Sequence, residues 1–291
     1  MRAGSTGTAI PLAPLDTAER EISRGERFEF GDNWARFLAV LDDARISEAE
    51  RSLKRMLEVD DLTGRRFLDI GCGSGLFSLA AHRLGARVHS FDYDPRSVAC
   101  AEALKRRHFR GDDTWTIEEG SALDAGYLRS LGAFDIVYSW GVLHHTGDMW
   151  TALEHAHRAV ASRGTLFIAI YNDCGSQSAR WRWIKRTYNR LPRPLRLPYT
   201  ILVIAPGAGK EALHALVARR LGPWLRSWTE VRSRRGMSRW RDIVDWVGGY
   251  PYEVAAPEAI FDFYRVRGFE LRRLRCGGVG LGCNEYVFVK T

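Results

Sequence analysis

The stretch FLDIGCGSGLFSLAA, residues 67–81, constrains the fold of this chain more than any other part of it. A short apolar run leads into a loop with three glycines, and a helix-like segment begins near Leu76. Glycines at 71, 73 and 75 allow backbone conformations that other residues avoid, so the loop can pass close to a ligand. Free N–H groups at the start of the following helix would point toward that ligand. The stretch therefore predicts a strand, a ligand-binding loop and a helix.

Short β-rich runs alternate with helical segments on both sides of this loop. The runs between residues 66 and 171 are RFLDI, ARVHSF, TWTIEE, FDIVYSW and GTLFIAIY. This alternation is typical of a parallel sheet with helices on both faces. Near the C-terminus, a helix around PEAIFDFYRVRG precedes FELRRLRC and NEYVFVK, which the glycine-rich GGVGLG joins as a β-hairpin.

The spacing of the glycines distinguishes between two cofactor classes. An NAD fingerprint would need its third glycine at position 76, where this chain has Leu. The pattern D-x-G-x-G-x-G instead resembles class I S-adenosylmethionine-dependent methyltransferases. HSFDYDP at 89–95, EEGSALD at 118–124, YSWGVLHHTGD at 138–148 and GTLFIAIYN at 164–172 extend the resemblance. A tight turn without a ligand is the alternative for a lone glycine loop, and these four segments argue against it.

The resemblance implies a Rossmann-like fold, with a seven-stranded, mostly parallel sheet in the order 3-2-1-4-5-7-6 and an antiparallel last strand. It also implies S-adenosyl-L-methionine as the cofactor. Asp92 would accept hydrogen bonds from both ribose hydroxyls. The backbone of Ala122 would contact the adenine edge, and Ser121 stands where the family usually has Asp. The cofactor-binding residues that it implies are Asp69, Gly71, Cys72, Gly73, Gly75, Asp92, Tyr93, Ser121, Ala122 and Trp140.

The resemblance further implies in-line transfer of a methyl group to a nucleophilic atom of an acceptor. For a hydroxyl acceptor the protein must supply orientation and a base. The pattern H-x-x-D of His145 and Asp148 resembles small-molecule O-methyltransferases of the sugar and quinol-ring type. An imidazole with its ordinary pKa of about 6.5 suits a base at neutral pH. We expect His145 to act as base or to orient the acceptor, with His144 as second candidate and two packed histidines as the alternative.

Consecutive residues point in different directions, so at most one of the two histidines should face the acceptor. The other is expected to be a packed or capping histidine. Asp148 is expected to cap the helix that follows it rather than to act as an acid.

Residues 173–253 interrupt the alternation with a basic segment rich in Trp. Residues 172–250 contain 16 Lys and Arg against 5 Asp and Glu, and six of the ten Trp fall between 181 and 246. The resemblance implies that this material, inserted after the fifth strand, forms a lid over the acceptor site. Its composition suits stacking on a sugar or aromatic ring, contact with an anionic membrane through 180–206, single-stranded nucleic acid, or a second small core of packed Trp.

Polar and aromatic residues near the expected lid are candidates for binding the acceptor. They are Tyr171, Asn172, Asp245, Tyr250, Tyr252, Glu253 and Asn284. Near residue 30, Asn33 and Trp34 are placed either to cover the cofactor or to form a helix cap with a packed Trp.

These patterns divide the chain into four parts. Residues 1–60 form an N-terminal helical cover whose first 30 residues are expected to be frayed and whose start is expected to be disordered. Residues 61–172 form the cofactor-binding core, 173–253 the lid, and 254–291 complete the core with a helix and a β-hairpin.

The expected function is O-methylation of a small molecule, a sugar or a lipid-linked glycan. Methyltransferases acting on nucleobase amino groups carry an Asn/Asp-Pro-Pro-aromatic run after the fourth strand, where this chain has SWGVLHH. An RNA methyltransferase that uses the basic insertion is the alternative. A non-catalytic cofactor-binding protein would keep Asp69 and Asp92 but lack a base, and His145 argues against it.

Cysteine usage and hydropathy favour a cytoplasmic enzyme. The five cysteines are odd in number and show no C-x-x-C spacing, so neither disulfides nor a metal site is expected. Pro11 and Pro14 interrupt the region where a signal peptide needs an apolar core. No run of about 18 uncharged apolar residues is present, so no membrane-spanning helix is expected. The net charge of +8 arises in the lid and allows peripheral contact with the inner face of a membrane.

Overall fold

Seven strands form one sheet in the order β3-β2-β1-β4-β5-β7-β6, as predicted. They are β1 Arg66–Ile70, β2 Arg87–Asp92, β3 Trp115–Glu119, β4 Phe134–Trp140, β5 Val160–Tyr171, β6 Phe269–Arg275 and β7 Cys283–Lys290. The first five are parallel, whereas β7 runs antiparallel to both β5 and β6. This computed structural model describes residues 17–109, 111, 113–229, 239–278 and 280–291.

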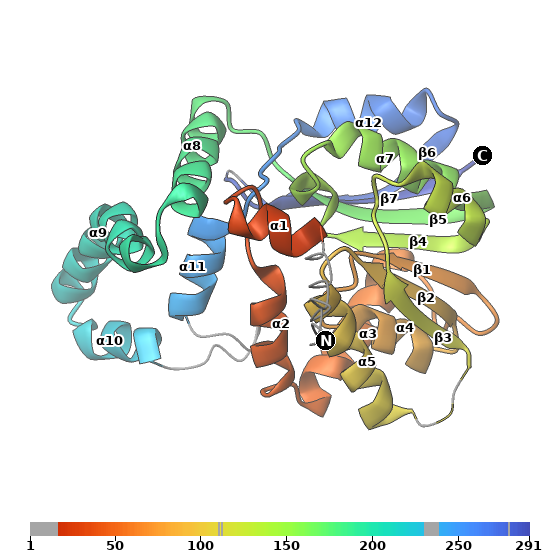
Figure 1. Ribbon diagram of the computed structural model, residues 1–291, viewed down its shortest axis with the longest axis horizontal. Helices are drawn as coiled ribbons and strands as arrows, with labels where there is room; N and C mark the ends of the chain where they lie inside the picture. Colours follow the sequence, from red (N-terminus) through yellow and green to blue (C-terminus); the bar gives the residue numbers. More distant parts are fainter. Residues whose placement is uncertain (1–16, 110, 112, 230–238, 279) are drawn as a thin grey trace, which may run out of the picture.

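Helices cover both faces of the sheet because neighbouring residues of a buried strand point to opposite faces. Phe67 of β1 packs with Leu79 in the cluster on the face of α3 Asp43–Leu57, α4 Leu76–Arg83 and α5 Pro95–His108. Leu68 packs with Leu153 on the other face, which α6 Ala125–Leu131, α7 Met149–Arg158 and α12 Pro257–Arg265 cover. Figure 1 shows α3, α4 and α5 on one side of the sheet and α7 and α12 on the other.

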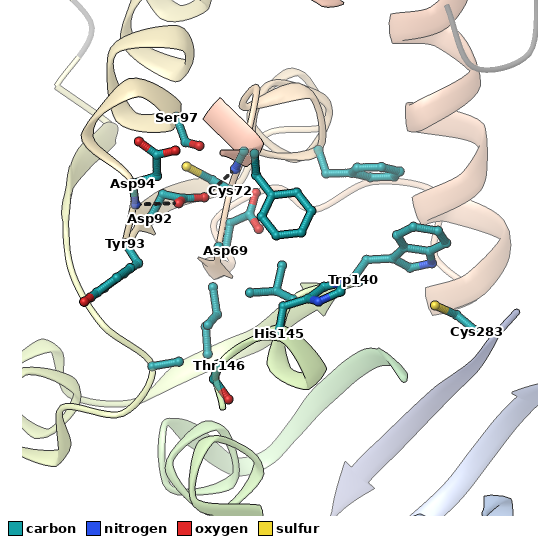
Figure 2. A pocket seen from close by; sticks show the side chains of 18 of the residues that line it. Asp69, Cys72, Asp92, Tyr93, Asp94, Ser97, Trp140, His145, Thr146 and Cys283 are labelled. Atoms are coloured by element: carbon teal, nitrogen blue, oxygen red, sulfur yellow. Dashed lines mark hydrogen bonds between the residues drawn. The ribbon is translucent and has the colours of Figure 1, made fainter. Parts of the chain in front are cut away.

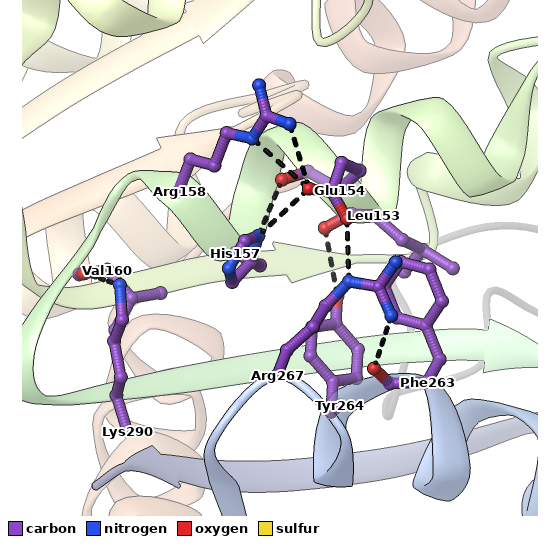
Figure 3. A network of polar contacts seen from close by, with 9 residues as sticks. All are labelled: Leu153, Glu154, His157, Arg158, Val160, Phe263, Tyr264, Arg267 and Lys290. Atoms are coloured by element: carbon purple, nitrogen blue, oxygen red, sulfur yellow. Dashed lines mark hydrogen bonds and ion pairs between the residues drawn. The ribbon is translucent and has the colours of Figure 1, made fainter.

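A polar network fastens α12 to α7 (Figure 3). Arg267, which follows α12, donates from Nε to Glu154 of α7 at 2.6 Å, and Arg158 donates from Nη2 to the same carboxylate at 3.0 Å. The hydroxyl of Tyr264 donates to the carbonyl of Leu153 at 3.3 Å. Although burial acts to raise it, these hydrogen bonds from arginine leave the pKa of Glu154 below its ordinary value.

The N-terminal cover begins with α1 Thr17–Ser23 and α2 Phe30–Leu38, followed by α3. Fraying of the first 30 residues is therefore wrong for 17–30, while the expected disorder of residues 1–16 falls outside the described residues. Gly31 donates its N–H to Asp94 at 2.9 Å, and Arg27 donates to the carbonyl of His145 at 3.2 Å. These bonds hold the cover against the carboxyl ends of the strands.

The lid contains α8 Ser176–Arg190, α9 Arg193–Val217, α10 Leu221–Thr229 and α11 Arg239–Gly248. In Figure 1 these helices lie to the left of the sheet, with α9 and α10 farthest from it. Tyr188, Val247 and Phe28 form a small core of their own, against which Trp181 packs. Trp181 also meets Trp246 edge to face at 5.1 Å, whereas Trp183 is 64% exposed. The expectation of a second Trp core is therefore confirmed for Trp181 and wrong for Trp183.

The expectation that no helix could span a membrane is wrong by length and composition. Among the described residues, the 25-residue helix α9 is long and apolar enough, and 6% of its most apolar window is buried. The prediction failed because it required an unbroken uncharged run. The uncharged stretch 197–209 is shorter than that, but only Lys210 and Glu211 separate it from the apolar end of the helix.

Candidate cofactor and acceptor site

A cavity of about 930 Å³ opens at the carboxyl ends of β1, β2 and β4, beneath the cover and the lid. Figure 2 shows Asp69, Cys72 and Asp92 on one side of it and Trp140, His145 and Thr146 on the other. Ligands in open α/β sheets bind at this position. The predicted residues that line the cavity are Asp69, Gly71, Cys72, Gly73, Asp92, Tyr93, Ser121, Ala122, Trp140, His145, Tyr171 and Asp245.

The glycine loop after β1 has the backbone that the sequence predicts. Gly71 and Gly73 have φ of +75° and +54°, in the left-handed region that favours glycine. Both line the cavity, whereas Gly75 does not. A Cβ on Gly75 would lie 2.9 Å from the Cβ of Ala101, so this glycine allows α4 and α5 to pack closely.

Asp92 ends β2 and braces the glycine loop. It accepts the N–H of Gly73 at 2.8 Å and the N–H of Asp94 at 3.0 Å, one on each carboxylate oxygen. Burial raises its pKa to about 6. An ionised carboxylate offers about four acceptor positions, so about two remain for further donors.

Asp69 at the end of β1 is 2% exposed and accepts a hydrogen bond from the hydroxyl of Ser78 at 2.5 Å. Burial raises its pKa to about 7. Cys72 is also buried in the loop, and burial raises the pKa of its thiol well above the usual value. Two carboxyl groups with raised pKa values on one cavity wall are typical of a functional site.

His145 lies at the opposite end of the cavity and is locked in one tautomer. Its Nδ1 donates to the carbonyl of Pro251, which can only accept, so Nε2 keeps its lone pair. Burial lowers the pKa of His145 to about 3, and the charges of Lys185 and Arg27 act in the same direction. The ordinary pKa expected for His145 is therefore wrong, because the sequence does not show that the folded chain removes this side chain from water.

His144 is fully buried and does not line the cavity. Its Nδ1 accepts the N–H of Tyr171 at 3.4 Å, so it is the packed member of the pair. Of the two candidates, only His145 lines the cavity. Asp148 accepts the N–H of Thr151 at 3.3 Å as the cap of α7, which confirms that prediction.

Tyr171 and Asp245 line the cavity near His145, but the other predicted acceptor residues do not. Glu253 accepts the N–H groups of Gly147 and Met149 at the start of α7. Burial raises the pKa of this carboxyl.

The remaining predicted acceptor residues support the cavity wall or lie beside it. Tyr252 is 1% exposed and packs against Tyr171, with ring centroids 5.3 Å apart. Asn284 donates to Asn172 at 3.1 Å and accepts the N–H of Gly277, so these two asparagines join β5 to the β6–β7 turn. Tyr250 does not line the cavity, and its carbonyl accepts the N–H of Phe28 at 2.9 Å.

Several residues that line the cavity could not be predicted from the sequence. Glu285 of β7 accepts from the indole N–H of Trp140 at 3.3 Å, and Arg275 lies 3.6 Å from its other oxygen. Phe30 of α2 lies 5.0 Å from His145, centroid to centroid, and Trp246 joins the same wall. Their aromatic and charged character was visible, but only the folded chain brings them together.

Trp34 lines the cavity, where it could cover a bound cofactor, which was one of the two roles considered for it from the sequence. A Cβ on Gly73 would approach its ring to 2.8 Å, so the indole lies directly over the glycine loop. Asn33 lies in the same helix, α2, whose cap residue is Glu29, so a capping role for Asn33 is wrong.

The cavity fits S-adenosylmethionine by the chemistry of its donors and acceptors. Asp92 retains acceptor positions for two ribose hydroxyls, and the backbone of Ser121 and Ala122 lies beyond the end of β3, next to β2 in the sheet. Asp69 supplies a carboxylate near the glycine loop, where a cationic sulfonium or ammonium group would be stabilised. Trp34 and Phe37 close the cavity from the cover.

Comparisons with known proteins agree with this geometry. Residues 68–166 match the family described as "Methyltransferase domain". A ubiquinone biosynthesis O-methyltransferase of Xanthomonas oryzae pv. oryzae is 31% identical over 112 residues, 38% of this chain and 45% of that protein. A protein of the same name from Rhizobium leguminosarum bv. trifolii is 29% identical over 147 residues, 47% of this chain and 56% of that protein. The chain thus matches about half the length of these curated relatives.

Solved structures share the fold at low sequence identity. Magnesium protoporphyrin IX methyltransferase from Synechocystis PCC 6803, with bound SAH, has a TM-score of 0.55 at 13% identity, covering 94% of this chain and all of that chain. An O-methyltransferase family protein from Burkholderia thailandensis has a TM-score of 0.52 at 16% identity, covering 94% of this chain and 67% of that chain. These likenesses establish the fold.

Proposed function

We propose that this chain, which belongs to the class I S-adenosylmethionine-dependent methyltransferases, transfers a methyl group to a hydroxyl oxygen of a small acceptor. The observation that carries the proposal is the placement of His145. Its tautomer is fixed by Pro251, and it lines the same cavity as the glycine loop and Asp92. The bound cofactor supplies an activated methyl group, so the chain needs to orient an acceptor and take up its proton.

His145 can do both through Nε2. A hydroxyl of the acceptor donates a hydrogen bond to this nitrogen, which aims an oxygen lone pair into the cavity. As the oxygen gains a methyl group it becomes far more acidic, so even a weakly basic imidazole can accept its proton. The carbonyl of Pro251 accepts from Nδ1 and stabilises the resulting imidazolium cation. The nearby charge of Lys185 favours rapid release of the proton from His145.

The walls around His145 favour an acceptor with a ring that can stack on aromatic side chains. Phe30, Tyr171 and Trp246 present aromatic surface, and Asp245 adds a carboxylate that can accept from further hydroxyls. A phenol suits this combination, and so does a sugar, either free or at the head of a lipid-linked glycan. With its five cysteines free, we place the enzyme in the cytoplasm, with membrane contact through the lid.

The test is transfer of labelled methyl groups from S-adenosylmethionine into cell extract that is then separated into small-molecule, lipid, glycan and RNA fractions. We expect label in the small-molecule, glycan or lipid fraction, as a methyl ether. The parallel reaction with His145→Ala should lose that label. Label confined to RNA would support a methyltransferase that reads nucleic acid through the basic lid. Cofactor binding without any transfer would support a protein that binds without catalysis.

A further inference from the structure

An apolar stripe runs along the outer helices of the lid, and no described part of the chain covers it. On this stripe, Leu202 is 71% exposed, Leu213 and Leu216 are each 59% exposed, and Leu225 of α10 is 54% exposed. Residues 195, 202, 213 and 216 repeat at helical spacing, so they share one face of α9. In Figure 1 this helix and α10 form the end of the molecule farthest from the sheet.

The opposite face of α9 is already occupied. Thr200 is buried, and the hydroxyl of Tyr199 donates to the carbonyl of Ile184 in α8 at 3.2 Å. Val203 and Ile204 pack on the small lid core around Tyr188. These contacts hold the N-terminal half of α9 against α8 and the small lid core. A helix held in this way cannot cross a bilayer while the lid stays folded, but it can lie in the plane of a membrane surface.

Basic side chains surround the stripe. From residue 193 to 226 the chain has six Lys and Arg and one acidic residue, Glu211. Arg193 begins α9, Lys210 lies within it, and Arg219 and Arg220 connect it to α10, all of them exposed. Between 197 and 209 no charged residue occurs, so the charge lies at the ends and flanks of the apolar stripe. This is the arrangement of an interfacial amphipathic helix.

We propose that α9 and α10 dock in the plane of an anionic lipid bilayer, with the stripe in the headgroup region and the basic residues against lipid phosphates. The surface is residues 193–226, which shifts the membrane segment 180–206 expected from sequence toward the C-terminus. A second copy of the chain is disfavoured, because a two-fold contact would bring two strongly basic faces together. RNA is disfavoured because the uncharged centre offers nothing to its phosphates.

Docking would also place the acceptor end of the cavity near the membrane. Helices α8 and α11 lie between α9 and the cavity, and α11 supplies Asp245 and Trp246 to its wall. An acceptor with a lipid tail could then present its head group without leaving the bilayer. This consequence rests on the proposed function, whereas docking itself does not.

The experiment measures binding of the whole chain to vesicles by flotation, without cofactor or acceptor. Vesicles of phosphatidylcholine with about 30% phosphatidylglycerol should bind the protein, and phosphatidylcholine alone should bind about tenfold less. Binding should weaken as salt rises from about 0.1 M to about 0.5 M. Leu202→Glu with Leu213→Glu should lower binding by at least about tenfold, because two leucines no longer enter the headgroup region. Val266→Glu is the control, because Val266 is exposed but lies outside the lid, beside α12. Vesicle binding of this variant should stay within about twofold of the parent.

Affinity for SAH, measured by calorimetry, checks that each variant is folded. If the leucine variant misfolds, Arg219→Gln with Arg220→Gln should still lower binding to anionic vesicles. Equal binding to neutral and anionic vesicles would overturn the proposal, as would unchanged binding in both the leucine and the arginine variants. A protein that binds no vesicles but shows a doubled mass in light scattering, which both variants abolish, would also overturn it and indicate a dimer. A chain that binds vesicles but transfers no methyl group would leave docking intact and remove the proposed function.

Discussion

Asp92 uses one carboxylate to brace the glycine loop and to offer acceptors to the cavity. We expect Asp92→Asn to weaken SAH binding by about 30- to 700-fold, which corresponds to about 2 to 4 kcal/mol for two charge-assisted hydrogen bonds. Stability of the ligand-free protein should change far less. Burial raises the pKa of Asp92 to about 6, so folding disfavours its ionised form and stability is lost as pH rises through that value.

Calorimetric titration with SAH measures the affinity of Asp92→Asn, and thermal melts of the ligand-free protein measure its stability. Glu119→Gln, an exposed carboxylate at the end of β3, is the matched control and should change neither. SAH affinity of the parent should also fall as pH drops below about 6, because Asp92 then takes up a proton. Unchanged affinity in Asp92→Asn would remove this residue from the site.

His145 should affect chemistry and leave cofactor binding alone. We expect His145→Ala to lower kcat by on the order of 100- to 10,000-fold with SAH affinity nearly intact, because the base acts on the acceptor proton. Since burial holds its pKa at about 3, the residue stays neutral above that value. The pH profile of kcat should therefore show no titration of His145 near pH 6.5. Any loss of activity of the parent near that pH should also be present in His145→Ala.

His157→Ala is the control histidine, because His157 lies in α7 and does not line the cavity. Its kcat should match the parent. A His145→Ala enzyme with kcat within about threefold of the parent would leave His145 as part of the scaffold.

At the scale of elements, helix α2 closes the cofactor end of the cavity. Trp34 lies over Gly73, and we expect Trp34→Ala to weaken SAH binding by about 5- to 50-fold through lost apolar contact. Leu38→Ala, in the same helix but outside the cavity, should lower thermal stability and leave SAH affinity unchanged. Calorimetry on both variants distinguishes them, and equal SAH affinity in the two would show that α2 does not contact the cofactor.

The joint between α7 and α12 should affect stability without affecting the site. Glu154→Gln should cost about 1 to 3 kcal/mol at neutral pH, because Arg267 and Arg158 lose a charged partner. The pKa of Glu154 is lowered in the folded chain, so its contribution is present above about pH 4.5 and is lost as pH falls through the lowered value.

Urea unfolding at pH 7 and at pH 4 measures this contribution. Glu270→Gln, an exposed carboxylate on β6, should be nearly neutral at both. A Glu154→Gln protein as stable as the parent at pH 7 would contradict the assignment.

The elements that the sequence predicted well are those with a regular local pattern. The strand runs around residues 66–70 and 134–140 and the turn from β1 to α4 follow from apolar periodicity and glycine spacing. Which residue of a strand faces the cavity depends on register instead. Asn284 was the candidate on β7, yet its neighbour Glu285 lines the cavity, because adjacent side chains point to opposite faces.

At the scale of the whole molecule, long-range packing decided what sequence could not. The contacts of His145 with Pro251 and Arg27 join residues about 100 positions apart. The bond to Pro251 sets its tautomer, and burial in the folded chain lowers its pKa. Likewise, Tyr252 and Glu253 had the right chemistry for an acceptor site but became supports for its walls. The motif predicted the end of the cavity that we propose for the cofactor, whereas the proposed acceptor end depends on the folded lid.

We propose that cofactor and acceptor bind at two ends of one cavity, and a crystal structure of the chain with SAH tests this placement. We predict adenine beside Ser121 and Ala122, ribose hydroxyls on Asp92, and sulfur facing the end of the cavity that holds His145 and Tyr171. SAH bound elsewhere, or with its sulfur separated from His145 by the cavity wall, would contradict this placement.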